Sequence, residues 1–348
     1  MITLEQEKLI FIISQPRAGS TLLQRILGNH SQVHTVAEPW IMLPAVYALR
    51  DRGYEAEYSS AISTKAMDLF LKELPNSRED FYNGIRLMYQ HIYGKALQST
   101  TKSYFLDKTP RYYYIIPELY SIFPDAKFIL LIRNPLDVLN SILNTWVKDN
   151  WFALYKYRDD LIKAPFLILE GKRELRDKLY ILKYEQLITD SENTIQDLCN
   201  YVGISFEPKM IDYNNNKIKE FKLGDPKSVY QYKKPNASNT NKWIDNTKKP
   251  QSWRIFKEYL ELIEENTFNE LGYSYRDCNQ KIMENSPAKS SLYFTVPFSR
   301  LIKKPEDVRQ FSCEKLFRSY FHKRHRFKQL VDEKGYSKTL LHIINKII

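Results

Sequence analysis

Ser14–Ser20 is a short segment whose composition suits the binding of an anion. The segment lies between an apolar run, Leu9–Ile13, and an amphipathic run, Thr21–Leu27, so it is expected to be a loop between a strand and a helix. Free N–H groups and the dipole at the start of a helix attract phosphate, and an arginine in the loop adds a planar cation. The residues assigned to this anion site are Arg17, Ala18, Gly19, Ser20 and Thr21. The common nucleotide loop, in which a second glycine precedes a lysine, is absent.

A second arginine follows another apolar run. Asp125–Ser141 reads DAKFILLIRNPLDVLNS, and its continuous apolar run Lys127–Ile132 predicts a strand buried within a parallel sheet. Arg133 is expected at the carboxyl end of that strand, where ligands gather in such sheets. Many nucleotide-hydrolysing enzymes hold magnesium there with an aspartate, whereas an arginine repels a metal and attracts an anion. The sequence therefore predicts a second phosphate site at the same edge of the sheet.

Two further charged residues follow short strand-like segments. Glu38 closes the segment Val33–Ala37, twenty-one residues after the first arginine, and Lys108 follows Tyr104–Leu106. At the carboxyl end of a parallel strand, Glu38 would lie beside the anion sites, where a carboxylate can accept a proton. Other readings stay open: Glu38 as a solvated capping group, Lys108 as a solvated loop lysine, and His34, on the same face of its strand as Glu38, as the base.

The elements that must position these residues alternate between strands and helices. The expected strands are Leu9–Ile13, Val33–Ala37, Tyr104–Leu106, Lys127–Ile132 and Leu179–Lys183. The expected helices are Thr21–Leu27, Leu136–Trp146, Ser191–Val202 and Gln251–Leu271, and Ile41–Thr101 is expected to be mainly helical. This order predicts an α/β fold, a three-layer sandwich with a mostly parallel central sheet.

The basic residues of the chain are concentrated near its C-terminus. The net charge is +11, and residues 300–348, with thirteen Lys and Arg against five Asp and Glu, contribute +8 of it. We therefore expect a catalytic domain over residues 1–280 and a basic C-terminal helical extension over residues 281–348, with Ser286–Pro305 as a linker. Glu314–Leu330 has the composition of a basic amphipathic helix. Such a helix can dock on the domain, contact an anionic membrane surface or mediate self-association.

Three segments resemble the motifs of the PAPS-dependent sulfotransferases, in the style of the tyrosylprotein, heparan and carbohydrate branch. PRAGSTLL, residues 16–23, resembles the loop that grips the 5′-phosphosulfate of PAPS. FLDKTPRYY, residues 105–113, resembles the E-K-[ST]-P-x-Y-[FY] segment of the heparan-type enzymes. KYEQLITDSENTIQDLCNYVGISFEP, residues 183–208, resembles the YEDL segment and the helix after it. The resemblance covers about Lys8–Tyr275 and implies the P-loop-NTPase-like sulfotransferase fold.

The resemblance implies which residues bind the nucleotide. Residues 17–21 match the loop that holds the 5′-phosphate. Arg133 and Ser141, eight residues apart, match the 3′-phosphate site of the family, which selects PAPS over ATP-like ligands. Tyr184 matches a residue near the nucleotide, although a structural role fits it equally well.

The resemblance also implies a reaction, the transfer of a sulfuryl group from PAPS to a hydroxyl or amine. Glu38 is the catalytic general base, because the tyrosylprotein and heparan branches place a glutamate at nearly this offset from the loop. Lys108 and Arg17 are catalytic residues that neutralise charge on the bridging oxygen as PAP leaves. Pro110 stands where the small-molecule branch has a histidine base, which strengthens the case for Glu38. PAPS is the expected co-substrate, and no metal is expected.

The sequence leaves the acceptor open among small molecules, carbohydrates, lipids and peptide tyrosines. Two other functions fit parts of the sequence: a P-loop kinase with a degenerate loop, and a non-enzymatic basic module that binds membrane or nucleic acid. The sulfotransferase reading predicts no nucleic-acid partner. Three widely spaced cysteines without a C-x-x-C pair predict reduced, packed thiols. The globular pattern begins by Lys8 without a signal peptide, and no apolar run reaches the ~18–20 residues of a membrane span, so we expect a cytoplasmic protein.

Overall fold

The computed structural model describes residues 3–148, 150–212, 240–293 and 295–304. The chain divides into two compact units. The first consists of Met1–Asn134 and Ala164–Thr240, and the second consists of Pro135–Lys163 and Asn241–Ile348. The predicted domain boundary near residue 280 stays a prediction, and the helix α13 (Tyr275–Glu284) runs across it.

The first unit is built on a five-stranded parallel sheet with the strand order β2-β3-β1-β4-β5. The strands are β1 (Leu9–Ser14), β2 (Val33–Thr35), β3 (Tyr104–Lys108), β4 (Lys127–Ile132) and β5 (Leu179–Lys183). All six residues of β1 are buried, as the continuous apolar run predicts for a strand covered on both faces. The predicted α/β class with a mostly parallel sheet is confirmed.

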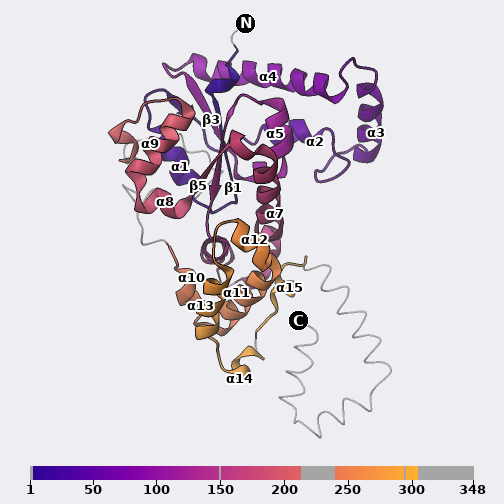
Figure 1. Ribbon diagram of the computed structural model, residues 1–348. Coiled ribbons are helices and arrows are strands. Elements are labelled where there is room, and N and C mark those ends of the chain that lie inside the picture. The colour runs from indigo at the N-terminus through magenta and orange to yellow at the C-terminus, as the bar shows by residue number, and fades with distance from the viewer. Residues whose placement is uncertain (1–2, 149, 213–239, 294, 305–348) are drawn as a thin grey trace. The chain divides into compact units, whose positions relative to one another are not determined.

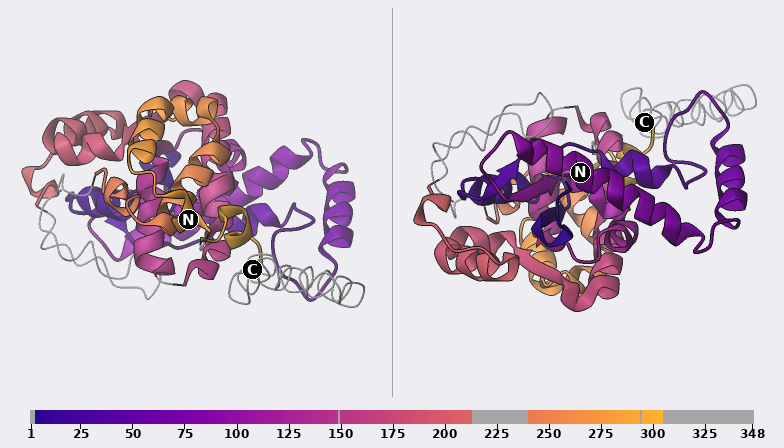
Figure 2. Two further views of the ribbon diagram at one scale, coloured as in Figure 1. Left: turned by 90° about the horizontal axis from the view of Figure 1, so that it is seen from below. Right: turned by 90° about the horizontal axis from the view of Figure 1, so that it is seen from above.

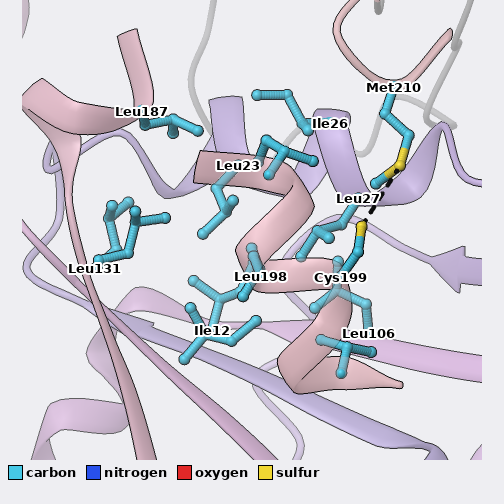
Figure 3. Packing of buried hydrophobic residues seen from close by; sticks show 14 of the residues in the cluster. Ile12, Leu23, Ile26, Leu27, Leu106, Leu131, Leu187, Leu198, Cys199 and Met210 are labelled. Atoms are coloured by element: carbon cyan, nitrogen blue, oxygen red, sulfur yellow. Dashed lines mark hydrogen bonds between the residues drawn. The ribbon is translucent and has the colours of Figure 1, made fainter. Parts of the chain in front are cut away.

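Helices on one side of the sheet enclose an apolar core (Figures 1 and 3). They are α1 (Ser20–Gly28), α8 (Tyr184–Thr189) and α9 (Ser191–Val202). Alternate strand residues meet them, since successive side chains of a strand point to opposite faces. This core contains Ile12, Leu106, Leu131, Leu23, Ile26, Leu27, Leu198 and Cys199. Burial raises the pKa of the Cys199 thiol to about 11, so the thiol stays protonated and serves as packing, as the sequence predicts.

The opposite face of the sheet carries an aromatic layer. Phe11 of β1 stacks on Phe128 at 5.5 Å between ring centroids and touches Phe123 and Tyr112. The helices on this side are α2 (Met42–Tyr47), α3 (Ser60–Leu71), α4 (Arg78–Gln98) and α5 (Ile116–Ile122). Both views of Figure 2 show α3 and α4 on the other side of the sheet from α8 and α9. The three-layer arrangement therefore follows, and the prediction of a mainly helical segment between Ile41 and Thr101 is confirmed.

Short helical turns complete the first unit, and one helix carries residues of both units. The turns are η1 (Gln6–Lys8), η2 (Pro110–Tyr114), η5 (Arg176–Lys178) and η6 (Pro208–Met210). The shared helix is α7 (Arg158–Leu175).

The second unit is helical over its described residues. Its helices are α6 (Pro135–Ile142), α10 (Trp243–Asn246), α11 (Pro250–Ile263), α12 (Glu265–Glu270), α13, α14 (Lys289–Leu292) and α15 (Phe298–Leu301), with the turns η3 (Leu143–Val147) and η4 (Trp151–Tyr157). The helix α11 is central, because Trp253 Nε1 donates to the carbonyl of Ile282 at 2.8 Å and Tyr259 donates to the carbonyl of Leu161 at 3.0 Å.

The prediction of a linker over Ser286–Pro305 is wrong for the residues that the structure describes. Over its described residues the segment is packed, since Phe298 and Leu301 are buried against α11. The backbone N–H of Phe298 donates to Glu258 at 2.6 Å, and the backbone N–H of Val296 donates to Gln251 at 2.7 Å. The packing of this segment depends on contacts of Phe298 and Leu301 with α11, which is distant in the sequence. The basic segment Glu314–Leu330 lies outside the described residues.

Candidate active site

The loop between β1 and α1 has the conformation that an anion site requires. Two of its residues have left-handed backbone, Arg17 at φ 71° and Gly19 at φ 102°, so the chain curls before α1 begins at Ser20. Ala18 and Ser20 are buried, which fixes the loop against the sheet. The predicted strand, loop and helix are all present, and the first amides of α1 lie at the carboxyl end of β1.

Three motifs that are distant in the sequence meet at this loop. The ring of Tyr184, the first residue of α8, packs on Gly19 so closely that a Cβ atom at Gly19 would lie 2.3 Å from its Cδ2. The Arg133 guanidinium lies 4.3 Å from the centre of the same ring and donates to the carbonyl of Arg17 at 3.2 Å. The Arg133 guanidinium therefore lies against the backbone of the predicted anion-binding loop.

Lys108 joins the loop to the candidate base. It is the last residue of β3 and is 1% exposed, and its Nζ donates to Glu38 Oε1 at 2.8 Å and to Thr21 Oγ1 at 3.4 Å. A buried ammonium requires partners of this kind, since its desolvation would otherwise be costly. The alternative that Lys108 is a solvated loop lysine is thus excluded.

The second oxygen of Glu38 is held as well. Trp40 Nε1 donates to Glu38 Oε2 at 3.3 Å, and the Arg111 guanidinium lies 5.5 Å from the centre of the Trp40 ring. The Glu38 side chain is 14% exposed, so it is neither fully solvated nor sealed. The Glu38 carboxylate is therefore partly accessible from solvent.

His34 occupies a different position from Glu38. It lies within β2, in register with Phe105, and its ring packs edge-on against the Phe105 ring at 5.7 Å. The geometry therefore favours Glu38 over His34 as the base.

Ser141 belongs to the second unit, where it is half-buried on α6. Arg133 is the penultimate residue of its segment of the first unit. A shared role of Arg133 and Ser141 on a 3′-phosphate stays a prediction.

A buried carboxylate beside the site was missed in the sequence. Asp107 is 0% exposed and accepts hydrogen bonds from the hydroxyls of Tyr93 at 2.7 Å, Tyr112 at 2.9 Å and Thr109 at 3.2 Å. Burial raises its pKa to about 6, against the opposing effect of these hydrogen bonds and of the Lys108 charge. The available signal was an aspartate at the end of an apolar strand, close to tyrosine and threonine residues that could satisfy it.

The groups around the loop are donors and cations of the kind that bind anions. The Arg133 guanidinium, the N-terminal amides of α1 and the buried Lys108 ammonium all lie at this loop. Among the described ranges, no three His, Cys, Asp or Glu side chains come together as ligands for a metal ion. In the same part of the chain, no helix is long and apolar enough to cross a membrane.

Comparison with known proteins bears on this arrangement. The family described as "Sulfotransferase family" matches residues 10–208, more than half of the chain, and this range contains every candidate site residue. The chain belongs to the sulfotransferase family.

The individual relatives of this chain are distant. The nodulation protein NoeE of Sinorhizobium fredii is 32% identical over 136 residues, which are 39% of this chain and 31% of that protein. Protein-tyrosine sulfotransferase 1 of Danio rerio is 26% identical over 218 residues, 59% of this chain and 56% of that protein. The chain thus spans less than two thirds of the length of either relative. A solved sulfotransferase domain, from the olefin synthase of Synechococcus PCC 7002, is 21% identical, covers 68% of this chain and 86% of that domain, and has a TM-score of 0.48.

Proposed function

We propose that the protein transfers a sulfuryl group from PAPS to a hydroxyl or amine of an acceptor molecule, with Glu38 as the general base. The observation that carries the proposal is the position of Lys108. Its ammonium contacts the candidate base on one side and the hydroxyl of Thr21, in the anion-binding loop, on the other. A cation in that position can neutralise the charge that develops as one bond breaks, while the neighbouring carboxylate accepts the proton released as the other bond forms.

The proposed reaction moves one proton and one sulfuryl group. The acceptor oxygen or nitrogen attacks the sulfur of PAPS and passes its proton to Glu38, while the bond from sulfur to the bridging oxygen breaks. The electron pair of that bond stays on the 5′-phosphate of PAP, where Lys108 and Arg17 neutralise the added charge. The products are a sulfated acceptor and PAP, and Glu38 then returns its proton to solvent.

The proposed nucleotide contacts follow from the loop. The amides of residues 18–21, with the hydroxyls of Ser20 and Thr21, would bind the 5′-phosphate. Arg133 and Ser141 would bind the 3′-phosphate, since a guanidinium forms paired hydrogen bonds to phosphate oxygens. Tyr184 supports both by packing between Gly19 and the Arg133 guanidinium. We propose PAPS as the co-substrate, and small molecules, carbohydrates, lipids or peptides as acceptor classes.

The first test is binding of PAP. PAP should raise the melting temperature in the presence of a metal chelator, whereas ATP with magnesium should not. Arg133→Ala should abolish the rise, and Arg78→Ala, which removes an exposed guanidinium on α4, should retain it. A rise with ATP and magnesium but not with PAP would favour a kinase and overturn the proposal.

The second test is turnover with labelled PAPS and a panel of acceptors, including tyrosine peptides, oligosaccharides and lipid extracts. Glu38→Gln should keep the PAP-dependent rise in melting temperature and lower label transfer by about 100-fold or more, the usual contribution of a general base. The control Glu7→Gln removes an exposed carboxylate and should leave transfer unchanged. An active Glu38→Gln variant would place the base elsewhere.

A further inference from the structure

Asp107 lies on the other face of the sheet from the pair of Glu38 and Lys108. It precedes Lys108 in β3, so the two side chains point in opposite directions. Lys108 reaches Thr21 and Glu38, and Asp107 reaches the hydroxyls of the aromatic side. No step of the proposed reaction uses Asp107.

Two of the three hydroxyls bound to Asp107 make a second hydrogen bond, and both of these go to the segment that follows Glu38. Thr109 Oγ1 accepts from the backbone N–H of Trp40 at 3.3 Å. The Tyr112 hydroxyl accepts from the backbone N–H of Met42 at 3.3 Å. A hydroxyl carries one hydrogen, so donating it to Asp107 leaves lone pairs free to accept from the backbone.

The ionised form of Asp107 determines the direction of these bonds. With a pKa of about 6, the carboxylate is charged at neutral pH and acts only as an acceptor. The hydroxyls of Thr109 and Tyr112 must then donate to it and are left to accept from the backbone of Trp40 and Met42. Asp107 thereby fixes the orientation of both hydroxyls.

The segment whose backbone N–H groups donate these bonds is strained. Trp40 has φ 59°, in the left-handed region that is unfavourable for a bulky side chain, so its surroundings must hold it there. From this turn the indole Nε1 reaches Glu38 Oε2, while Lys108 holds Oε1. Both oxygens of the candidate base are thus fixed, one directly from β3 and one through the turn at Trp40.

We infer that Asp107 is a positioning residue that holds the Trp40 turn through Thr109 and Tyr112 and so orients the Glu38 carboxylate. The catalytic part of this inference rests on the proposed function, because it takes Glu38 as the base. The structural part, the link from Asp107 to the Trp40 indole, does not depend on the reaction.

Two tyrosines provide a matched pair of variants. Tyr93→Phe and Tyr112→Phe each remove a buried hydroxyl from the same oxygen, Asp107 Oδ2. Only the Tyr112 hydroxyl also accepts from the backbone of Met42. Both variants should lower the melting temperature by similar amounts, but only Tyr112→Phe should disturb the turn.

The first readout is the indole N–H resonance of Trp40 in a nitrogen–proton NMR spectrum, assigned among the five tryptophans with Trp40→Phe. Tyr112→Phe should shift or broaden this resonance, and Tyr93→Phe should leave it in place. The second readout is label transfer from PAPS. Tyr112→Phe should lower kcat by about tenfold to 100-fold, the effect of a small misplacement of a reacting group, with PAP affinity unchanged, and Tyr93→Phe should leave kcat within about twofold.

Thr109 gives an independent test if Tyr112→Phe fails to fold. Thr109→Val removes the hydroxyl and should reproduce the change in the Trp40 resonance, whereas Thr109→Ser keeps the hydroxyl and should restore it. The inference would be overturned if the two tyrosine variants changed the Trp40 resonance equally. It would also be overturned if neither Tyr112→Phe nor Thr109→Val changed it. If the resonance responds as expected but the wild type transfers no label, the positioning link stands and the proposed function fails. If the wild type transfers label and the resonance does not respond, the function stands and the inference fails.

Discussion

Replacement of Gly19 by alanine should damage both the stability of the protein and its affinity for PAP. Gly19 combines a left-handed backbone, at φ 102°, with close packing against the Tyr184 ring. An added Cβ atom would lie 2.3 Å from Cδ2 and 2.5 Å from Cε2 of that ring, closer than van der Waals contact allows. Gly203, which ends α9 at φ 88°, has the same kind of backbone but nothing within 4 Å of a Cβ atom, so Gly203→Ala is the matched control.

The two variants separate backbone strain from steric overlap. Left-handed backbone costs a residue with a Cβ atom about 1–2 kcal/mol, and both variants should lose this much. Gly19→Ala must in addition move the Tyr184 ring by about 1 Å or more within a packed core, and overpacking of this kind costs about 1–3 kcal/mol. We therefore expect a loss of about 1–2 kcal/mol for Gly203→Ala and about 2–5 kcal/mol for Gly19→Ala in the free energy of unfolding.

The affinity for PAP should divide the variants more sharply. The ring that Gly19→Ala displaces also lies against the Arg133 guanidinium, 4.3 Å away, so the loop and the proposed 3′-phosphate contact would move together. Calorimetric titration with PAP should show at least about a tenfold loss of affinity for Gly19→Ala, equivalent to about 1.4 kcal/mol, and no change for Gly203→Ala. Urea denaturation gives the stabilities. Equal destabilisation of the two variants, with full PAP affinity in Gly19→Ala, would refute the packing argument.

Two further predictions concern the first unit. Burial alone would raise the pKa of Glu207, but hydrogen bonds from the side chain and backbone of Ser31 lower it to about 2. The ionised form of Glu207 therefore stabilises the fold above about pH 4.5, and this stabilisation is lost as the pH falls toward 2. Glu207→Gln should therefore lower the free energy of unfolding by about 1–2 kcal/mol at pH 7, a modest amount because the carboxylate borders on solvent. Urea denaturation at pH 3 should show a smaller difference between the variant and the wild type. The same difference at both pH values would contradict the assignment. Leu198→Ala, in the core between α9 and the sheet, should cost about 2–5 kcal/mol by leaving a cavity, whereas Leu262→Ala, at an exposed position, should change the urea midpoint little; equal losses would mean that the first core is looser than the packing indicates.

The sheet could be predicted because buried parallel strands leave a simple record in the sequence. The runs at Leu9–Ile13 and Phe128–Ile132 are apolar throughout, and both belong to strands buried on two faces. The loop after β1 could be predicted equally well, since a strand, one arginine, one glycine and the start of a helix are all local features of the sequence. The meeting of the loop with Arg133 followed from the general rule that parallel strands end at one edge.

The parts that were missed depend on contacts between distant residues. The strand β3 was expected to end at Leu106, but it continues through Asp107 and Lys108. Two charged residues argue against a buried strand unless their partners are known, and those partners lie on α4, in η2 and at Glu38. The strained turn at Trp40 and the packed segment around Phe298 could not be predicted for the same reason, because both depend on contacts with residues distant in the sequence.

The end of β3 shows how one strand can serve both the scaffold and the reaction. A strand in the middle layer of a three-layer fold presents successive side chains to two different layers. At Asp107 and Lys108 this alternation sends a carboxylate into the aromatic layer and an ammonium toward the loop of the opposite layer. The segment from Glu38 to Met42 touches both, through the Lys108 ammonium on one side and the hydroxyls of Thr109 and Tyr112 on the other. A change on the aromatic side can therefore alter the carboxylate that faces the nucleotide loop without contact to any ligand, and for this reason variants of Tyr112 and Thr109 belong in any mutational study of the site.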